Sequence, residues 1–184
     1  MVYRWNFTNF ILPQSFRMKH WFFLLFCSVL ILSCHPSLEA ESQAKSPFKG
    51  QASAIPPGLE SGQSYLSVYS HIYSKSQARS EDLTITISLR NTDPDHPLYL
   101  SKAEYYNTHG EAIKSYLDQS VKLEALETLE WVIDQKDRSG GSGANFLFSW
   151  AQDSLASDPL FEAVMISTSG QQGLSFHTTA KRIR

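Results

Sequence analysis

The chain has 184 residues, of which 42% are hydrophobic and 12% aromatic, so it can bury one core of moderate size and we expect a single folded domain. Three of its 16 basic residues, Arg4, Arg17 and Lys19, precede an apolar segment, which leaves 13 basic against 18 acidic residues in the remainder. This acidic balance lacks the basic surface that phosphate backbones require, and it argues against nucleic-acid binding.

The N-terminal region has the pattern of an export signal. Residues 21–32 read WFFLLFCSVLIL and follow Met18, Lys19 and His20. A helix needs roughly 20 apolar residues to span a bilayer, so this run is too short to do so, but it matches the apolar region of a signal peptide. Because the basic residues stand directly before this run, we expect translation to start at Met18 and residues 1–33 to include the signal peptide.

The segment from Leu30 to Cys34 resembles a bacterial lipobox, although Leu32 is larger than the residue usually found there. The resemblance implies cleavage before Cys34 and attachment of acyl chains, such as palmitate, to this cysteine. Each buried methylene adds about 0.8 kcal/mol of membrane affinity, so these chains would anchor the protein. His35 in the second mature position resembles lipoproteins that are passed to the outer membrane, which predicts a periplasmic location there. The alternative is a cleaved signal peptide with a free cysteine.

The stretch after the lipobox is rich in Ser, Ala, Pro and Gly and shows no sustained hydrophobic period. Such a composition buries too little apolar surface to offset its ordering entropy. We therefore expect residues 34–62 to form a flexible linker and residues 63–184 to form the folded domain. The only two cysteines, Cys27 and Cys34, both precede this domain, so it contains no disulfide.

The remaining chain is predicted to be a series of short strands. Leu83, Ile85, Ile87 and Leu89 alternate with polar residues, as in a strand with one buried face. Similar runs, separated by turn sequences rich in Asn, Asp, Gly and Pro, occur at residues 65–73, 98–106, 111–117, 128–134, 144–151, 160–168 and 174–182. This pattern predicts an all-β fold, a single antiparallel β-sandwich of immunoglobulin-like type with about seven to eight strands.

Three further features refine this prediction. Residues 121–129 are the best helical candidate, although their apolar residues also fit the start of a strand. Residues 160–166 are apolar on both faces apart from Glu162, which predicts a central strand. Trp131 and Trp150 are expected in the core or at its edge, since large aromatic side chains dominate burial in small sandwiches.

Several strings of the chain together resemble a bacterial family known as domain of unknown function 3124. The strings are residues 89–94 (LRNTDP), Tyr105 and Tyr106 with Gly110, residues 139–146 (SGGSGANF), residues 162–166 (EAVMI) and residues 170–176 (GQQGLSF). The resemblance covers about residues 61 to 183. It implies an exported bacterial protein and assigns no activity and no catalytic residues.

The glycine-rich segment 137–145, DRSGGSGAN, is the strongest candidate for a binding loop. Its glycines permit close approach of a ligand, and successive N–H groups in such a loop can bind an anion. It is neither a phosphate-binding P-loop nor the nucleophile turn of a hydrolase. The favoured alternative is a structural loop or bulge in which Asn145 bonds backbone groups. The candidate binding residues are Asp137, Ser139, Gly140, Gly141, Ser142, Gly143 and Asn145, together with Gln171 and Gln172 of the SGQQG turn.

A row of aromatic residues is a second candidate. Tyr65, Tyr69, His71 and Tyr73 share one face if residues 65–73 form one strand, with Ser67 between them, while Leu66, Val68 and Ile72 occupy the other face. An exposed row would be a stacking platform for a sugar or peptide. We favour ordinary cross-strand packing, because both faces carry apolar groups.

Asp93, Asp95 and His96 are a third candidate, as a divalent-cation site. They are only three ligands and lack the spacing of zinc or calcium sites, so turn chemistry is the favoured interpretation. The histidines at 71, 109 and 177 show no ligand-like pairing. No metal and no cofactor are predicted.

We therefore expect a lipid-anchored, non-catalytic module of the cell envelope that binds a protein or another surface component. The alternative is a protein that binds a small polar or anionic molecule through its glycine-rich loops. An enzyme has the least support, because no nucleophile, base and orienting group can be assembled.

Overall fold

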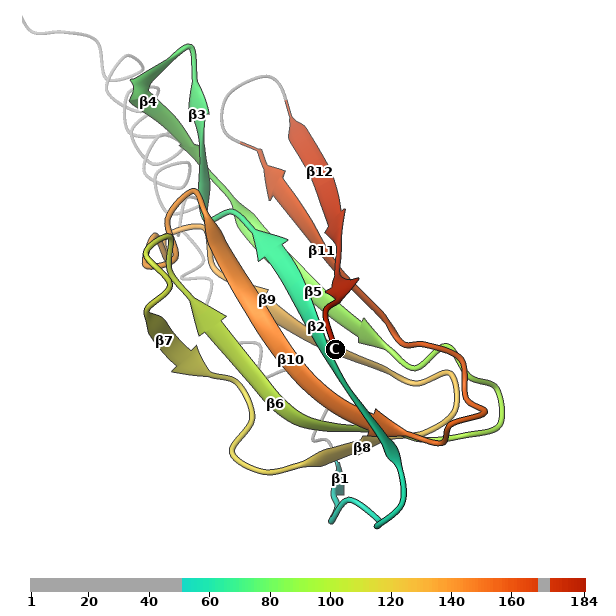
Figure 1. Cartoon of the computed structure of the whole chain (residues 1–184). Helices are drawn as coiled ribbons and strands as arrows, with labels where there is room; N and C mark the ends of the chain where they lie inside the picture. Colours follow the sequence, from blue (N-terminus) through green and yellow to red (C-terminus); the bar gives the residue numbers. More distant parts are fainter. Residues whose placement is uncertain (1–50, 169–172) are drawn as a thin grey trace, which may run out of the picture. The chain divides into compact units, whose positions relative to one another are not determined.

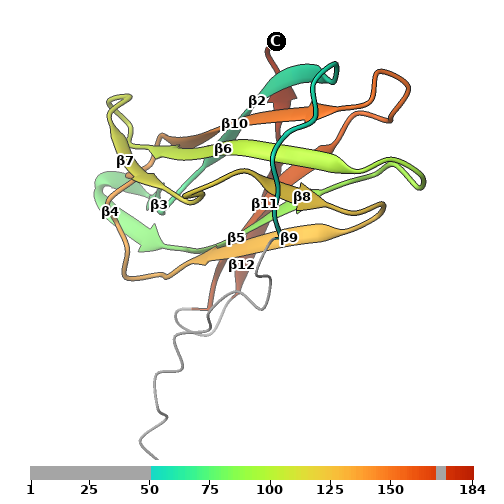
Figure 2. The same cartoon turned by 90° about the horizontal axis from the view of Figure 1, so that it is seen from below.

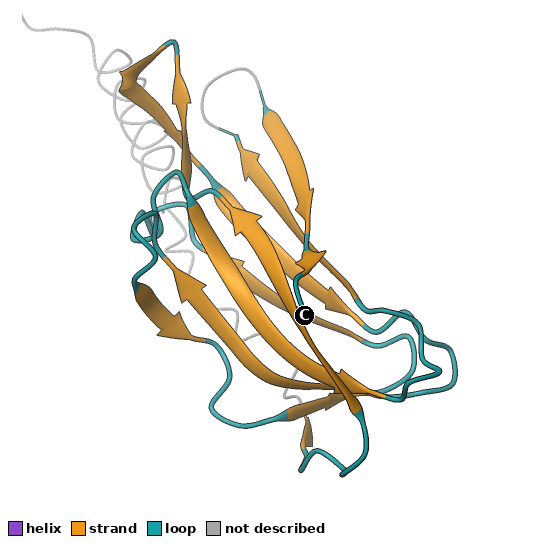
Figure 3. Ribbon diagram, in the orientation of Figure 1, coloured by secondary structure: helices purple, strands orange, loops and turns teal. Residues whose placement is uncertain are grey.

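The computed structural model describes residues 51–168 and 173–184, and all regular structure in this part of the chain is β (Figure 3). The described residues all fall within one compact unit. Cys34, the proposed signal peptide, Gln171 and Gln172 lie outside the described residues.

The strands form two packed sheets and one projecting hairpin, and every pairing is antiparallel. Figures 1 and 2 show the two sheets face to face. The larger sheet has the order β1-β8-β6-β10-β2-β13, and β7 pairs with β6. Its strands are β1 (Gln51–Ala52), β8 (Val121–Leu123), β6 (Leu98–Tyr106), β10 (Ala144–Gln152), β2 (Glu60–Val68), β13 (Lys181–Arg182) and β7 (Ala112–Ser115).

The smaller sheet has the order β12-β11-β5-β9. Its strands are β12 (Leu174–Thr179), β11 (Leu160–Ser167), β5 (Thr84–Arg90) and β9 (Thr128–Ile133), and the hairpin consists of β3 (His71–Ser74) and β4 (Ser76–Asp82). The antiparallel β-sandwich predicted from the alternating sequence is thus confirmed.

The core forms where the inward faces of the two sheets meet. Along β5 the alternation predicted from the sequence is present, because Ile85, Ile87 and Leu89 are buried. Opposite them, β10 contributes Phe146 and Phe148, whose rings stack with centroids 5.4 Å apart. Trp150 is buried as predicted, while Trp131 is half-buried at the edge of the core.

Two of the predicted strands are each divided in the structure. The run 65–73 is split because β2 ends at Val68 and β3 begins at His71, where the chain turns into the hairpin (Figure 1). The run 174–182 is split between β12 in the smaller sheet and β13 in the larger sheet. β4 was not among the predicted strands, since its polar sequence SQARSED carries no apolar alternation.

The remaining strand predictions can be compared with the structure directly. Val121–Leu123 is a strand, so the helical alternative for residues 121–129 is wrong. β11 lies between β12 and β5, which confirms the central strand, although Val164 and Ile166 on its outer face are exposed.

The ordered domain begins before the boundary expected from composition. β1 pairs with β8, and the backbone N–H of Ser53 donates to the carbonyl of Ser120 over 3.1 Å. β2 already begins at Glu60. Residues 51–62 therefore include strands, because backbone pairing with the larger sheet compensates for their polar composition.

Candidate functional site

The glycine-rich loop uses its polar backbone groups within the protein. The N–H of Ser139 donates to the Asp137 carboxylate over 3.0 Å, and the N–H of Gly141 donates to the carbonyl of Arg138 over 3.1 Å. The N–H of Gly143 donates to the Thr108 hydroxyl over 3.0 Å. Because these three donors already have partners, they do not form an open concavity for an anion.

The same loop also forms hydrogen bonds with the residues that follow β6 and β2. The carbonyl of Gly140 accepts hydrogen bonds from the N–H and the hydroxyl of Thr108, which follows β6. The carbonyl of Gly141 accepts from the N–H and the hydroxyl of Ser70, which follows β2. Gly141 has a φ of +78°, a value that glycine adopts without steric cost. These contacts favour the structural interpretation of the loop.

The part predicted for Asn145 in that interpretation is wrong. Asn145 lies in β10, opposite Ser67 and Tyr106, and its side chain forms no hydrogen bond with the described residues. Thr108 makes the bonds across the loop instead. Ser142 is half-buried, and Gln171 and Gln172 fall outside the described residues.

The predicted tyrosine row does not share one face, because it is distributed over separate elements. Tyr65 lies on β2 and is partly exposed, whereas Tyr73 lies on the hairpin with 56% of its surface exposed. Tyr69 lies between these elements and packs edge-on against Phe176, with ring centroids 5.7 Å apart. The rings therefore form no continuous platform.

Asp93 has the turn role that the sequence analysis favoured. Its carboxylate accepts backbone N–H groups from Ser157 (2.8 Å), Asp95 (2.9 Å) and His96 (2.7 Å). These hydrogen bonds hold the pKa of the Asp93 carboxyl well below its ordinary value. Across residues 51–168 and 173–184, no three metal-ligating side chains form a cluster that could hold an ion.

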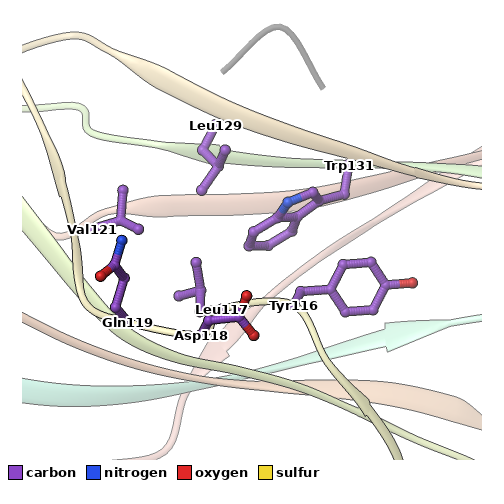
Figure 4. A pocket seen from close by; sticks show the side chains of 7 residues that line it. All are labelled: Tyr116, Leu117, Asp118, Gln119, Val121, Leu129 and Trp131. Carbon is purple, nitrogen blue, oxygen red and sulfur yellow. The ribbon is translucent and has the colours of Figure 1, made fainter. Parts of the chain in front are cut away.

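A pocket that the sequence did not reveal lies at the open edge of the sandwich (Figure 4). It has a volume of about 180 Å³. The connection between β7 and β8 provides one wall, and β9 of the other sheet provides the facing wall with Trp131. The lining residues are Tyr116, Leu117, Asp118, Gln119, Val121, Leu129 and Trp131.

Two aromatic rings meet at this pocket, Tyr116 from the connection between β7 and β8 and Trp131 from β9 of the smaller sheet. Trp131 lies on the inward face of β9, between the buried Leu129 and Ile133, so the strand alternation directs it to the gap between the sheets. The ring of Tyr116 contacts it with centroids 5.4 Å apart and planes tilted by 52°. Burial, with a smaller effect from the Asp137 carboxylate, raises the pKa of Tyr116 to about 12, so its hydroxyl stays protonated at neutral pH.

The polar groups around these rings are free to bind a ligand. The Asp118 carboxylate, the Gln119 amide and the Trp131 indole N–H have no hydrogen-bond partner among the described residues. A larger hollow of about 410 Å³ lies beside the loop from β1 to β2. There, Gln63 donates to the Ser149 hydroxyl and Ser101 donates to the Ser149 carbonyl, so these polar groups are engaged within the protein. The aromatic pocket is therefore the better candidate site.

Comparisons with known proteins identify a family but no activity. Residues 61–183 match the family described as "Protein of unknown function (DUF3124)". No curated protein matches the chain. Among solved structures, the crystal structure of Thermotoga maritima 1070 is similar, with 7% identity, coverage of 65% of this chain and 92% of that chain, and a TM-score of 0.39. No helix in the described part of the chain is long and apolar enough to span a membrane.

Proposed function

The chain belongs to the DUF3124 family of unknown function, and from this premise we propose that it is a lipid-anchored, non-catalytic recognition module of the cell envelope. In this proposal, acyl chains on Cys34 hold the domain at the membrane surface, and the aromatic pocket contacts the partner.

The observation that carries the recognition role is the chemistry of the pocket. Binding sites combine a concave surface that includes apolar side chains with a few convergent polar groups. Here an aromatic pair and the aliphatic Val121 and Leu129 provide the apolar surface, and Asp118 and Gln119 provide polar groups without internal partners. The membrane anchor rests on the lipobox-like sequence that ends at Cys34.

The alternative binding site in the glycine-rich loop has less support. Its amides at Ser139, Gly141 and Gly143 donate to groups of the protein itself, so an anion would have to displace existing hydrogen bonds. Breaking an existing hydrogen bond has a cost that a surface anion recovers only in part.

The proposal is tested by photo-crosslinking in living cells. A photoreactive amino acid replaces Gln119 at the pocket in the full chain, and in a matched variant it replaces the exposed Gln77 on β4. We expect a discrete crosslinked species from position 119 that is absent from position 77. Equal labelling at both positions, or no species from position 119, contradicts recognition through this pocket.

A further inference from the structure

Building on the proposed function, we infer that the aromatic pocket binds one neutral sugar ring of a cell-surface glycan. Three properties of the pocket point to this ligand class: its ring surface, its free hydrogen-bonding groups and its charge.

The ring surface suits the apolar face of a sugar. Trp131 lines the pocket and contacts Tyr116, with ring centroids 5.4 Å apart and planes tilted by 52°, while Tyr116 also packs against Phe146 of the core. The face of an aromatic ring carries partial negative charge. The C–H groups on one face of a pyranose are weakly positive, and they therefore pack favourably against such a surface.

The free polar groups suit hydroxyl groups. Each hydroxyl both donates and accepts, so a sugar needs donors and acceptors around its edge. The Asp118 carboxylate accepts only, the Trp131 indole donates only, and the Gln119 amide does both. All three lack partners among the described residues, and they belong to the same small pocket.

The charge around the pocket favours a neutral ligand over an ion. The Lys114 ammonium lies 4.5 Å from the centre of the Tyr116 ring, so a cation already occupies one face of that ring. This positive charge repels a cationic ligand, and the negative charge of Asp118 repels an anionic one. The carboxylate of Asp137, which also acts on Tyr116, adds further negative charge, whereas a ligand without charge is repelled by none of these groups.

The inference is tested with the full chain in a detergent that has no sugar head group. The sugar probes are methyl β-glucopyranoside, N-acetylglucosamine and cellobiose, and the ionic probes are choline and inorganic phosphate. Binding is measured by saturation-transfer NMR, which reports the ligand protons that contact the protein, and by titration calorimetry. We expect at least one sugar to bind with transfer to its ring C–H protons, while choline and phosphate give no such signal.

Matched variants locate the binding. Trp131→Ala should weaken sugar binding by up to about tenfold, because loss of an aromatic contact costs up to about 1.4 kcal/mol. Val132→Ala is the control, since Val132 is the next residue of β9, is 63% exposed and does not line the pocket. It should leave binding unchanged. Gln119→Ala at an exposed position serves as a second variant, and we expect it to weaken binding severalfold without affecting folding.

Absence of binding by every sugar probe would overturn the inference. So would sugar binding that is equal in Trp131→Ala and Val132→Ala and unaffected by Gln119→Ala. Binding of choline or phosphate that depends on Trp131 would also overturn it. A crosslinked partner at position 119 combined with no sugar binding refutes the ligand class and leaves the recognition role intact. The absence of both refutes the recognition role as well.

Discussion

The hydroxyl of Tyr105 lies directly against Gly140, so a Cβ atom at position 140 would collide with it. Such an atom would also meet the Cβ of Ala144 at 2.7 Å, well inside normal contact distance. Tyr105 is 1% exposed, and its hydroxyl has no hydrogen-bond partner among the described residues. Gly140 is therefore required by packing, which explains one glycine of the glycine-rich loop without a ligand.

This contact predicts opposite effects for two substitutions. Gly140→Ala should lower the free energy of unfolding by about 1 to 3 kcal/mol, the usual cost of overpacking. Tyr105→Phe should raise it by about 1 kcal/mol, because it removes a buried hydroxyl without a partner. Urea denaturation monitored by circular dichroism measures both effects.

The double variant, Gly140→Ala with Tyr105→Phe, supplies the control. Tyr105→Phe should recover part of the loss caused by Gly140→Ala, because one of the colliding atoms is gone, whereas the contact with Ala144 remains. Purely additive effects would show that the two residues do not interact as described.

A second prediction concerns the buried pair Trp150 and Ser64. The indole N–H of Trp150 donates to the Ser64 hydroxyl over 3.0 Å, and both residues are buried. Ser64→Ala should lower the free energy of unfolding by about 1 to 3 kcal/mol, because the indole N–H loses its partner in the core. The control is Ser67→Ala, because Ser67 is a half-buried serine of the same strand. Chemical denaturation measures both variants, and an equal loss of unfolding free energy in Ser67→Ala would argue against the specific hydrogen bond.

A third prediction concerns pH. Backbone N–H groups of Ser157 and Asp95 stabilise the ionised Asp93 carboxylate and hold its pKa well below the ordinary value of 3.8. The resulting stability is fully present above the unfolded-state pKa near 4, and it is lost as the pH falls through the lower folded-state pKa. Wild-type protein should therefore have a lower urea midpoint at pH 3 than at pH 6.

Asp93→Asn isolates this contribution. The variant should have a lower urea midpoint than wild type at pH 6, and the difference should shrink as the pH falls below 4, because the carboxylate of unfolded wild-type protein gains a proton there while that of the folded protein stays ionised. Asp95→Asn, a substitution at an exposed neighbouring position, is the control. A pH profile for Asp93→Asn that runs parallel to that of wild type would contradict the assignment.

A fourth prediction tests the membrane anchor. Cys34→Ser should abolish incorporation of an alkynyl palmitate analogue in cells and leave the signal peptide uncleaved, because the acylated residue is missing. Cys27, the only other cysteine, lies inside the apolar run, and the variant Cys27→Ser should still be labelled. Labelling of Cys34→Ser, or loss of labelling only in Cys27→Ser, would contradict the anchor.

The local sequence was sufficient to predict most of the strands. On β5 and β10 the apolar residues alternate because one face of each strand packs into the core, and this pattern is visible in the sequence alone. The family resemblance was also contained in short strings of the sequence, and the match over residues 61–183 confirms it. By contrast, the polar strand β4 could not be predicted, since it forms through backbone pairing with β3 and buries no apolar face.

The candidate site depended on tertiary structure. Tyr116 and Trp131 are 15 positions apart, one in the connection between β7 and β8 and the other on β9, so no local pattern places their rings in contact. The hydrogen bonds that occupy backbone groups of the glycine-rich loop likewise involve Thr108 and Ser70, which are distant in sequence. The sequence determined which faces of its strands are apolar, whereas the packing of the two sheets decided which polar groups retain free hydrogen-bonding capacity, because that capacity depends on every neighbour in space.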